Sequence, residues 1–201
     1  MTRAKSYHLK SYHHGDLRAE LLKAARAKLD ADGYETLSLR ELTRDLGVSR
    51  SAPYAHFANR EALLLGLVVL GSQNLLARFE AAAALDLSAD EKLAAACRAH
   101  LEFAATQPEM YRLLMMAPIA ADSHALINPE QTIMLFEQLV GAVISGDDRG
   151  KDHDTAVACL ATLHGFCMLR IHRRIMPDVD ADIAAETIIA ATVRLARTAQ
   201  F

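Results

Sequence analysis

Two pairs of sulfur and imidazole side chains are the first candidates for chemistry in this sequence. Cys97 and His100 are three residues apart in one apolar stretch, and His164 and Cys167 have the same spacing in another. Residues three apart share a helix face, and two cysteines with two histidines are a common tetrahedral zinc set. The hypothesis is a metal- or thiol-responsive sensor. The alternative is buried core, because the third cysteine, Cys159, leaves an odd number that indicates reduced thiols rather than disulfides.

Catalytic motifs are the second candidate. Asp147, Asp148, Asp152 and Asp154 gather carboxylates, but they precede a helical pattern, and acidic residues are expected at a helix start. The sequence contains no HExxH motif, no phosphate-binding glycine loop and no recognisable Ser-His-acid set. It therefore predicts a protein that is not an enzyme, with no catalytic residue and no cofactor.

The third candidate is a polar and aromatic run between two apolar patterns. Gly47, Val48 and Ser49 end one short helical pattern and open another, which predicts a helix-turn-helix with Ser49 as the second helix cap. In such a unit the start of the second helix faces base edges in the major groove. Arg50 can form paired bonds to guanine, and its neighbours can donate, accept or contact a thymine methyl group. Double-stranded DNA is the predicted partner.

Residues beside this reading helix have side chains suited to the DNA backbone. Tyr54 and His56 carry polar tips for phosphate oxygens, although packing or capping would also explain them. Arg60 begins a helix, whose N-terminus itself favours an anion. Ser38 and Arg40 begin the helix before the turn, and Arg40 could also reach a base. The predicted DNA-binding residues are Ser38, Arg40, Ser49, Arg50, Ser51, Ala52, Tyr54, His56 and Arg60.

The predicted DNA-binding residues must be positioned by the fold of the chain, which the sequence predicts to be all-α. Alanine and leucine dominate every long segment, only five prolines and nine glycines occur, and strand-like alternation is absent. Capping signals predict helix starts at Asp16, at Ser38 with Glu41, at Asn59, and at Ser88 with Glu91. About nine helices are expected, over residues 17–31, 38–46, a short stretch from 49, 59–85, 88–107, 108–116, a segment from 129, 152–175 and 180–200.

Charge divides the chain into two parts. Residues 1–60 hold 11 Lys and Arg against seven Asp and Glu, a formal +4, so the net −3 leaves −7 for the remainder. A basic end suggests a polyanionic partner there. The expected domains are a basic flexible arm (1–14), which could enter a minor groove, a helix-turn-helix head (15–60) and a body (61–201). The longest apolar run, residues 62–71, is too short to span a bilayer, which favours a cytoplasmic protein without a membrane segment.

Four motifs resemble the DNA-binding head of tetracycline-repressor-type (TetR/AcrR) regulators: YHHGDLR at 12–18, LREL at 39–42, LGVS at 46–49 and YAHFANREALL at 54–64. This chain departs from the family pattern at Pro53, where a bulky apolar residue is usual, and at Arg60, where lysine is common. The resemblance implies an all-α homodimer that binds a palindromic operator, predicted to act as a repressor. It also implies release by a small, apolar effector held in the body. An effector-independent DNA-binding factor and a helical small-molecule carrier are the alternatives.

The body resembles the family's ligand domain at residues 107–116 and at Leu163-His164-Gly165, which is similar to a Trp-His-Gly signature of one subgroup. Flexible thioethers suit an irregular apolar ligand. The last two helices are rich in alanine, which permits close packing of two subunits into a four-helix bundle. Such a dimer would place its reading helices about 34–36 Å apart. The predicted effector-pocket residues, for each of which core packing is the alternative, are Phe103, Tyr111, Met115, Phe136, His164 and Met168.

Overall fold

The computed structural model describes residues 17–116, 129–145, 153–175 and 177–198, and within them it contains helices and no strand. The all-α prediction is confirmed. The elements are α1 (Leu17–Asp32), η1 (Tyr34–Thr36), α2 (Leu39–Leu46), η2 (Ala52–Ala55), α3 (Arg60–Ala83), α4 (Ala89–Thr106), α5 (Pro108–Met116), α7 (Pro129–Ser145), α8 (His153–Ile171) and α9 (Ala181–Thr198). The predicted flexible arm, the Asp16 cap, Asn128 and the acidic run at 147–152 lie outside the described residues.

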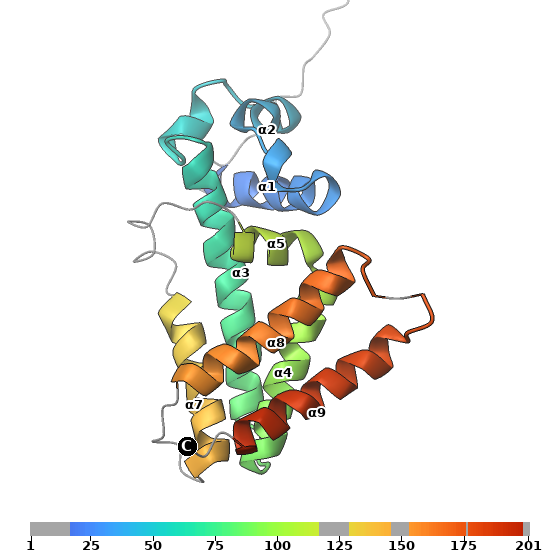
Figure 1. Cartoon of the computed structure of the whole chain (residues 1–201). Helices are drawn as coiled ribbons and strands as arrows, with labels where there is room; N and C mark the ends of the chain where they lie inside the picture. The colour runs from blue at the N-terminus through green and yellow to red at the C-terminus, as the bar shows by residue number, and fades with distance from the viewer. Residues whose placement is uncertain (1–16, 117–128, 146–152, 176, 199–201) are drawn as a thin grey trace, which may run out of the picture.

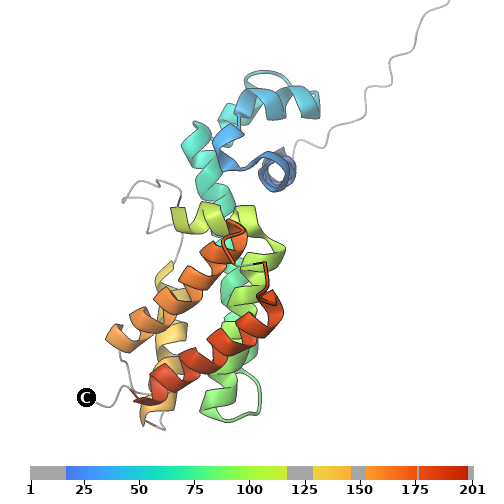
Figure 2. The same ribbon diagram turned by 45° about the vertical axis from the view of Figure 1, so that its right-hand side comes forward.

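The long helix α3 connects the two parts of the molecule. At its N-terminal end lie α1, η1, α2 and η2, which form the head (Figure 1). Along the rest of its length α3 packs against α4, α5 and α7, and α8 and α9 pack on each other and on α4. Figure 2 shows the same division from a second direction, with the head at one end and the body helices at the other. Because α3 is continuous, no linker separates head from body.

The head folds as its apolar pattern predicts. Leu21, Ala25 and Leu29 of α1 are fully buried, as is Leu42 of α2. Gly47 ends α2 with a left-handed backbone (φ 67°, ψ 25°), a conformation that glycine adopts without the steric cost of a side chain. Its neighbour Val48 packs against the core, and the Val48 N–H donates to the carbonyl oxygen of Thr43 at 3.2 Å. The glycine turn and its apolar plug are therefore confirmed.

Of the helix caps predicted at Ser38, Asn59 and Ser88, two are present and one is not. Asn59 accepts the Ala62 N–H at 2.8 Å and starts α3, and Ser88 and Glu91 form a complete capping box at α4. The box predicted for Ser38 and Glu41 is wrong, because Ser38 makes no side-chain capping bond. Instead the carboxylate of Glu41 accepts from Lys28 of α1 at 3.2 Å. The Glu41 side chain therefore forms an ion pair between α1 and α2 instead of the predicted capping bond.

Two helices, α3 and α8, are long and apolar enough to cross a bilayer on length and composition alone. For α3 the fold gives another reason for the apolar composition, since Leu63, Leu67 and Phe79 belong to the buried core. Leu70 of the same helix is an exception, since it is 43% exposed. Less of α8 is covered: 33% of its most apolar stretch is buried, against 44% for α3. More of the apolar surface of α8 than of α3 is therefore exposed.

Candidate nucleic-acid interface and the core of the body

The predicted reading helix is a single 3-10 turn. It is η2, within a segment (residues 49–56) that we call the reading turn. Its backbone bonds join residues three apart: Ala52 N–H to Ser49 O at 3.1 Å, and Tyr54 N–H to Ser51 O at 3.2 Å. Pro53 has no N–H and cannot make the bond to Ser49 that an α-helix requires. The prediction of a helix capped by Ser49 is therefore wrong, since the residue before η2 is Ser51, which makes no side-chain capping bond.

Most of the predicted DNA-binding side chains are exposed at the head. Arg40, Ser49, Arg50, Ser51 and His56 are all exposed, and Tyr54 is 47% exposed, unusually high for an aromatic side chain. The remaining predicted contacts, Ser38, Ala52 and Arg60, are partly buried. The hydroxyl groups of the two reading-turn serines are 3.4 Å apart. The head therefore presents hydroxyl, guanidinium, phenol and imidazole groups on a short exposed segment.

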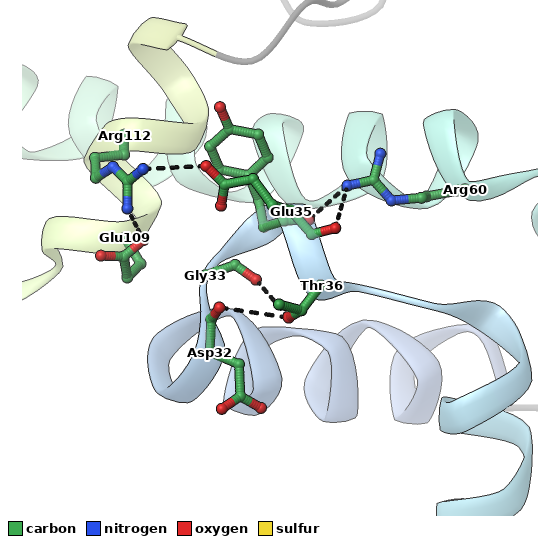
Figure 3. A network of polar contacts seen from close by, with 8 residues as sticks. Asp32, Gly33, Glu35, Thr36, Arg60, Glu109 and Arg112 are labelled. Carbon is green, nitrogen blue, oxygen red and sulfur yellow. Dashed lines mark hydrogen bonds and ion pairs between the residues drawn. The ribbon is translucent and has the colours of Figure 1, made fainter.

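Arg60 is engaged within the protein. Its Nη2 donates to the carbonyl oxygens of Tyr34 at 2.6 Å and Glu35 at 3.2 Å (Figure 3). Its Nε donates to the carbonyl oxygen of Leu37 at 3.0 Å. Within the described part of the chain, Nη1 has no hydrogen bond. Arg60 thus holds the turn η1 from the start of α3, while its predicted phosphate contact stays untested.

Two groups of functional interest were not singled out in the sequence. Arg44 lies one helical turn after Arg40 on α2, and its side chain is 73% exposed. The spacing of four residues would have revealed that both arginines share a face. The second group is the ion pair between Glu35 of η1 and Arg112 of α5 at 3.0 Å. A separation of 77 residues gives no local signal for that contact.

In the body, a phenol lies between two imidazoles. The Tyr111 hydroxyl is 3.1 Å from His100 Nε2 and 2.9 Å from His164 Nδ1, so α4, α5 and α8 meet at one oxygen atom. A tyrosine hydroxyl donates one hydrogen atom, so one imidazole donates to it and the other accepts from it. His100 Nδ1 is buried and has no hydrogen-bond partner among the described residues. We call this arrangement the polar triad.

Burial keeps two members of the triad, His100 and Tyr111, uncharged at neutral pH. Burial lowers the pKa of His100 from 6.5 to about 4, with a smaller effect from nearby His164. Burial also raises the pKa of Tyr111 well above its ordinary value, with a further contribution from Cys167. The hydrogen bonds of the triad lie in an otherwise apolar core, where such bonds are directional and an unpaired polar atom is costly.

Five of the six predicted effector-pocket residues lie in or around this core. Tyr111 and His164 belong to the triad, and the Phe103 and Tyr111 rings are 6.4 Å apart. Phe136 packs against Phe79, which in turn stacks on His100, and Met168 packs against the core. The sixth residue, Met115, is 43% exposed on α5 and lies outside the group. Phe103, Tyr111 and Phe136 are completely buried, as core packing would also require.

The sulfur and imidazole pairs do not come together as a metal site. No group of three or more His, Cys, Asp or Glu side chains that could hold a metal occurs in the described ranges. Cys97 instead lies near Cys159, and burial raises its pKa to about 12; burial likewise raises that of Cys167 to about 11. Protonated, buried thiols are poor nucleophiles and poor metal ligands. The structure gives the sensor hypothesis no support.

The fold and its exposed head define an all-α protein with a helix-turn-helix. Residues 21–67 match the family model of bacterial regulatory proteins of the tetR family, and residues 93–192 match the tetracyclin repressor-like C-terminal domain. The chain belongs to the tetR family of transcriptional regulators, and the resemblance noted in the sequence is confirmed. The regulators of this family bind DNA and are not enzymes.

Similar proteins agree with this assignment. An uncharacterized HTH-type transcriptional regulator of Mycobacterium tuberculosis is 29% identical over 98 residues, which cover 48% of this chain and 42% of that protein. A protein of unknown function from Rhodococcus sp. RHA1 is 29% identical with a TM-score of 0.76, covering 92% of this chain and 97% of the other. A tetR-family regulatory protein from Rhodococcus RHA1 has a TM-score of 0.67 at 22% identity, covering 91% and 98%, and shows the same fold.

Proposed function

We propose that this regulator is a cytoplasmic homodimeric repressor that binds a palindromic operator through its two reading turns and is released by a small, mainly apolar effector. The observation that carries the DNA-binding part is the exposed polar surface of residues 49–56 beside Arg40, in a head of the tetR family. Arg50 and Ser51 would contact bases, and Tyr54 and His56 would contact phosphates. The proposed domains remain an arm (1–14), a head (15–60) and a body (61–201).

The dimer proposal is supported by a stripe along α8. Val157, Ala161, Gly165 and Leu169 are spaced four residues apart, so they share one face, and all four are exposed. Val157 is 63% exposed, and Ile183 on the neighbouring helix α9 is 69% exposed. A methyl group at Gly165 would meet no atom within 4 Å. Large apolar groups flanking small ones would let two copies of α8 approach closely about a twofold axis.

Ala161→Arg is expected to convert the dimer into single chains, because it places a charged group at the centre of this apolar stripe. Sedimentation at micromolar concentration would measure the change in mass. Ala81→Arg is the matched control, since Ala81 is also an exposed alanine in a helix but lies on α3. The proposed interface is wrong if Ala161→Arg sediments as the wild type does.

The effector proposal is supported by the polar triad. Tyr111 and His164 give an otherwise apolar core a point at which a ligand could form hydrogen bonds, and His164 is only partly buried. Methionine at position 168 could adjust to the shape of a ligand. Binding of this kind would act on α4, α5 and α8 together.

Arg50→Ala is expected to weaken operator binding by about 1–3 kcal/mol and to relax the preference at one base position, because a bidentate guanine contact would be lost. Selection of bound sites from random DNA, followed by anisotropy titration, measures both effects. Lys92→Met, which removes a charge near the start of α4, should select the same sites as the wild type. Unchanged preference in Arg50→Ala would mean that the reading turn does not face the bases as proposed.

A further inference from the structure

The turn η1 is held from two sides, although it is only three residues long. Arg60, at the start of α3, donates hydrogen bonds to three backbone carbonyl oxygens in η1 and directly after it. These are the oxygens of Tyr34, Glu35 and Leu37, at donor–acceptor distances of 2.6 to 3.2 Å. Ser38, which directly precedes α2, follows the last of them. The segment that joins α1 to α2 is therefore held by the Arg60 guanidinium group, in addition to the Lys28–Glu41 ion pair between the two helices.

The second set of contacts to η1 comes from α5 of the body. Arg112 of α5 donates from Nη2 to Glu35 Oε1 at 3.0 Å and from Nη1 to Glu109 Oε2 at 2.9 Å, and its guanidinium carbon lies 6.0 Å from the centre of the Tyr34 ring (Figure 3). Packing around η1 is close. Gly33, at φ 78°, would place a Cβ 3.0 Å from Glu35 Oε2 and 3.3 Å from Glu109 Oε2.

The geometry of these contacts requires arginine rather than a positive charge alone. A guanidinium presents several N–H groups in a fixed plane, so Nε and Nη2 can bind separate carbonyl oxygens together. Lysine has one nitrogen atom and cannot span the Leu37 and Tyr34 carbonyls in the same way. Since both Nε and Nη2 are engaged, only Nη1 is left for a phosphate.

We propose that Arg60 is a positioning residue: together with Arg112 it fixes η1, and with it the angle of α2 and the reading turn relative to the body, instead of serving as a phosphate contact. The proposal rests on the proposed function, because it needs a dimer that binds two half-sites. In that dimer, the angle of each head determines how far apart the half-sites must lie. Arg60 therefore controls operator spacing and leaves the half-site sequence to the reading turn.

The test compares Arg60→Met, Arg60→Lys and the wild type by selecting bound sites from random DNA. For both variants we expect the wild-type half-site, a distribution of spacings broadened by at least one base pair, and roughly tenfold weaker binding to the wild-type operator. The slope of log affinity against log salt should match the wild type, because no phosphate contact is removed. A phosphate contact would instead lower the slope by about 0.9 in Arg60→Met and leave Arg60→Lys unchanged. That result, with unchanged spacing, would overturn the proposal.

A second set of variants keeps Arg60 and removes the contact between Arg112 of α5 and Glu35 of η1. Glu35→Gln and Arg112→Met should each broaden the spacing, and the double variant should broaden it no further than Arg112→Met, because both remove the same contact. This set carries the test if Arg60→Met does not fold, which circular dichroism would reveal. Lys92→Met controls for the loss of a positive charge far from η1. Wild-type spacing in all of these variants would contradict the proposal, whereas a wild type that binds no DNA would contradict the proposed function instead.

Discussion

Phe57→Ala is expected to lower the free energy of unfolding by about 3–5 kcal/mol, the usual cost of removing a buried phenylalanine side chain. Phe57 is 2% exposed and directly follows the reading turn. Its ring lies 3.2 Å from the point that a Cβ at Gly66 of α3 would occupy, and the Arg18 guanidinium of α1 lies 5.3 Å from its centre. It therefore anchors the reading turn to both α1 and α3. Urea unfolding followed by circular dichroism, at one fixed protein concentration, measures the change.

Tyr54→Ala is the matched control, because it removes an exposed aromatic group from the same segment. Its stability should stay within about 0.5 kcal/mol of the wild type, as is usual for surface positions, while its DNA affinity should fall. If Tyr54→Ala proved less stable than Phe57→Ala, the side chain that anchors this segment in the core would be Tyr54 and not Phe57.

Acid is expected to destabilise the body through His100. The folded-state pKa is lowered to about 4 from 6.5, so below pH 6.5 the unfolded chain binds a proton that the folded chain does not. Stability from this group is complete above pH 6.5 and falls as the pH drops to about 4, by about 3 kcal/mol in total at about 1.4 kcal/mol per pKa unit. Urea unfolding at a series of pH values between 7 and 4 measures this loss.

The comparison that isolates this effect is His100→Gln, which keeps a polar group near Tyr111 but does not titrate in this range. Its stability should depend on pH less steeply than that of the wild type. His172→Gln, which removes an exposed histidine near the end of α8, should follow the wild-type curve. Equal pH dependence in the wild type and His100→Gln would show that another group is responsible.

The head could be predicted closely because its signals are local. The α1 stripe, the Gly47 turn and the Asn59 cap each depend on residues within one or two helical turns. The 3-10 form of the reading turn could not be predicted in the same way. Pro53 lacks the N–H that would bond to Ser49 in an α-helix, and the sequence does not show which backbone hydrogen bonds form instead. The role of Arg60 was equally hidden, because its carbonyl partners lie 23 to 26 residues earlier in the chain.

In the body, the sequence indicated the right residues without their arrangement. Tyr111 and His164 were candidates for one pocket, but their bond depends on how α5 lies against α8. The same limit explains the cysteines. Spacing placed Cys97 and Cys167 on suitable helix faces, whereas the packing of α4 on α8 brings Cys97 near Cys159 instead. Helix register between distant segments is a property of the whole core.

The uninterrupted α3 has a mechanical consequence. At 1.5 Å per residue, its 24 residues form a strut roughly 36 Å long, rooted among the body helices and bearing the head at its tip. A swing of about 5° at the root would displace the tip by about 3 Å, a sizeable fraction of one base-pair step. Gly71, near the middle of α3, packs closely against α5, because a side chain there would collide with the sulfur of Met110 at 2.6 Å. A small tilt of α3 against the body helices would thus be enlarged into a greater displacement of the head.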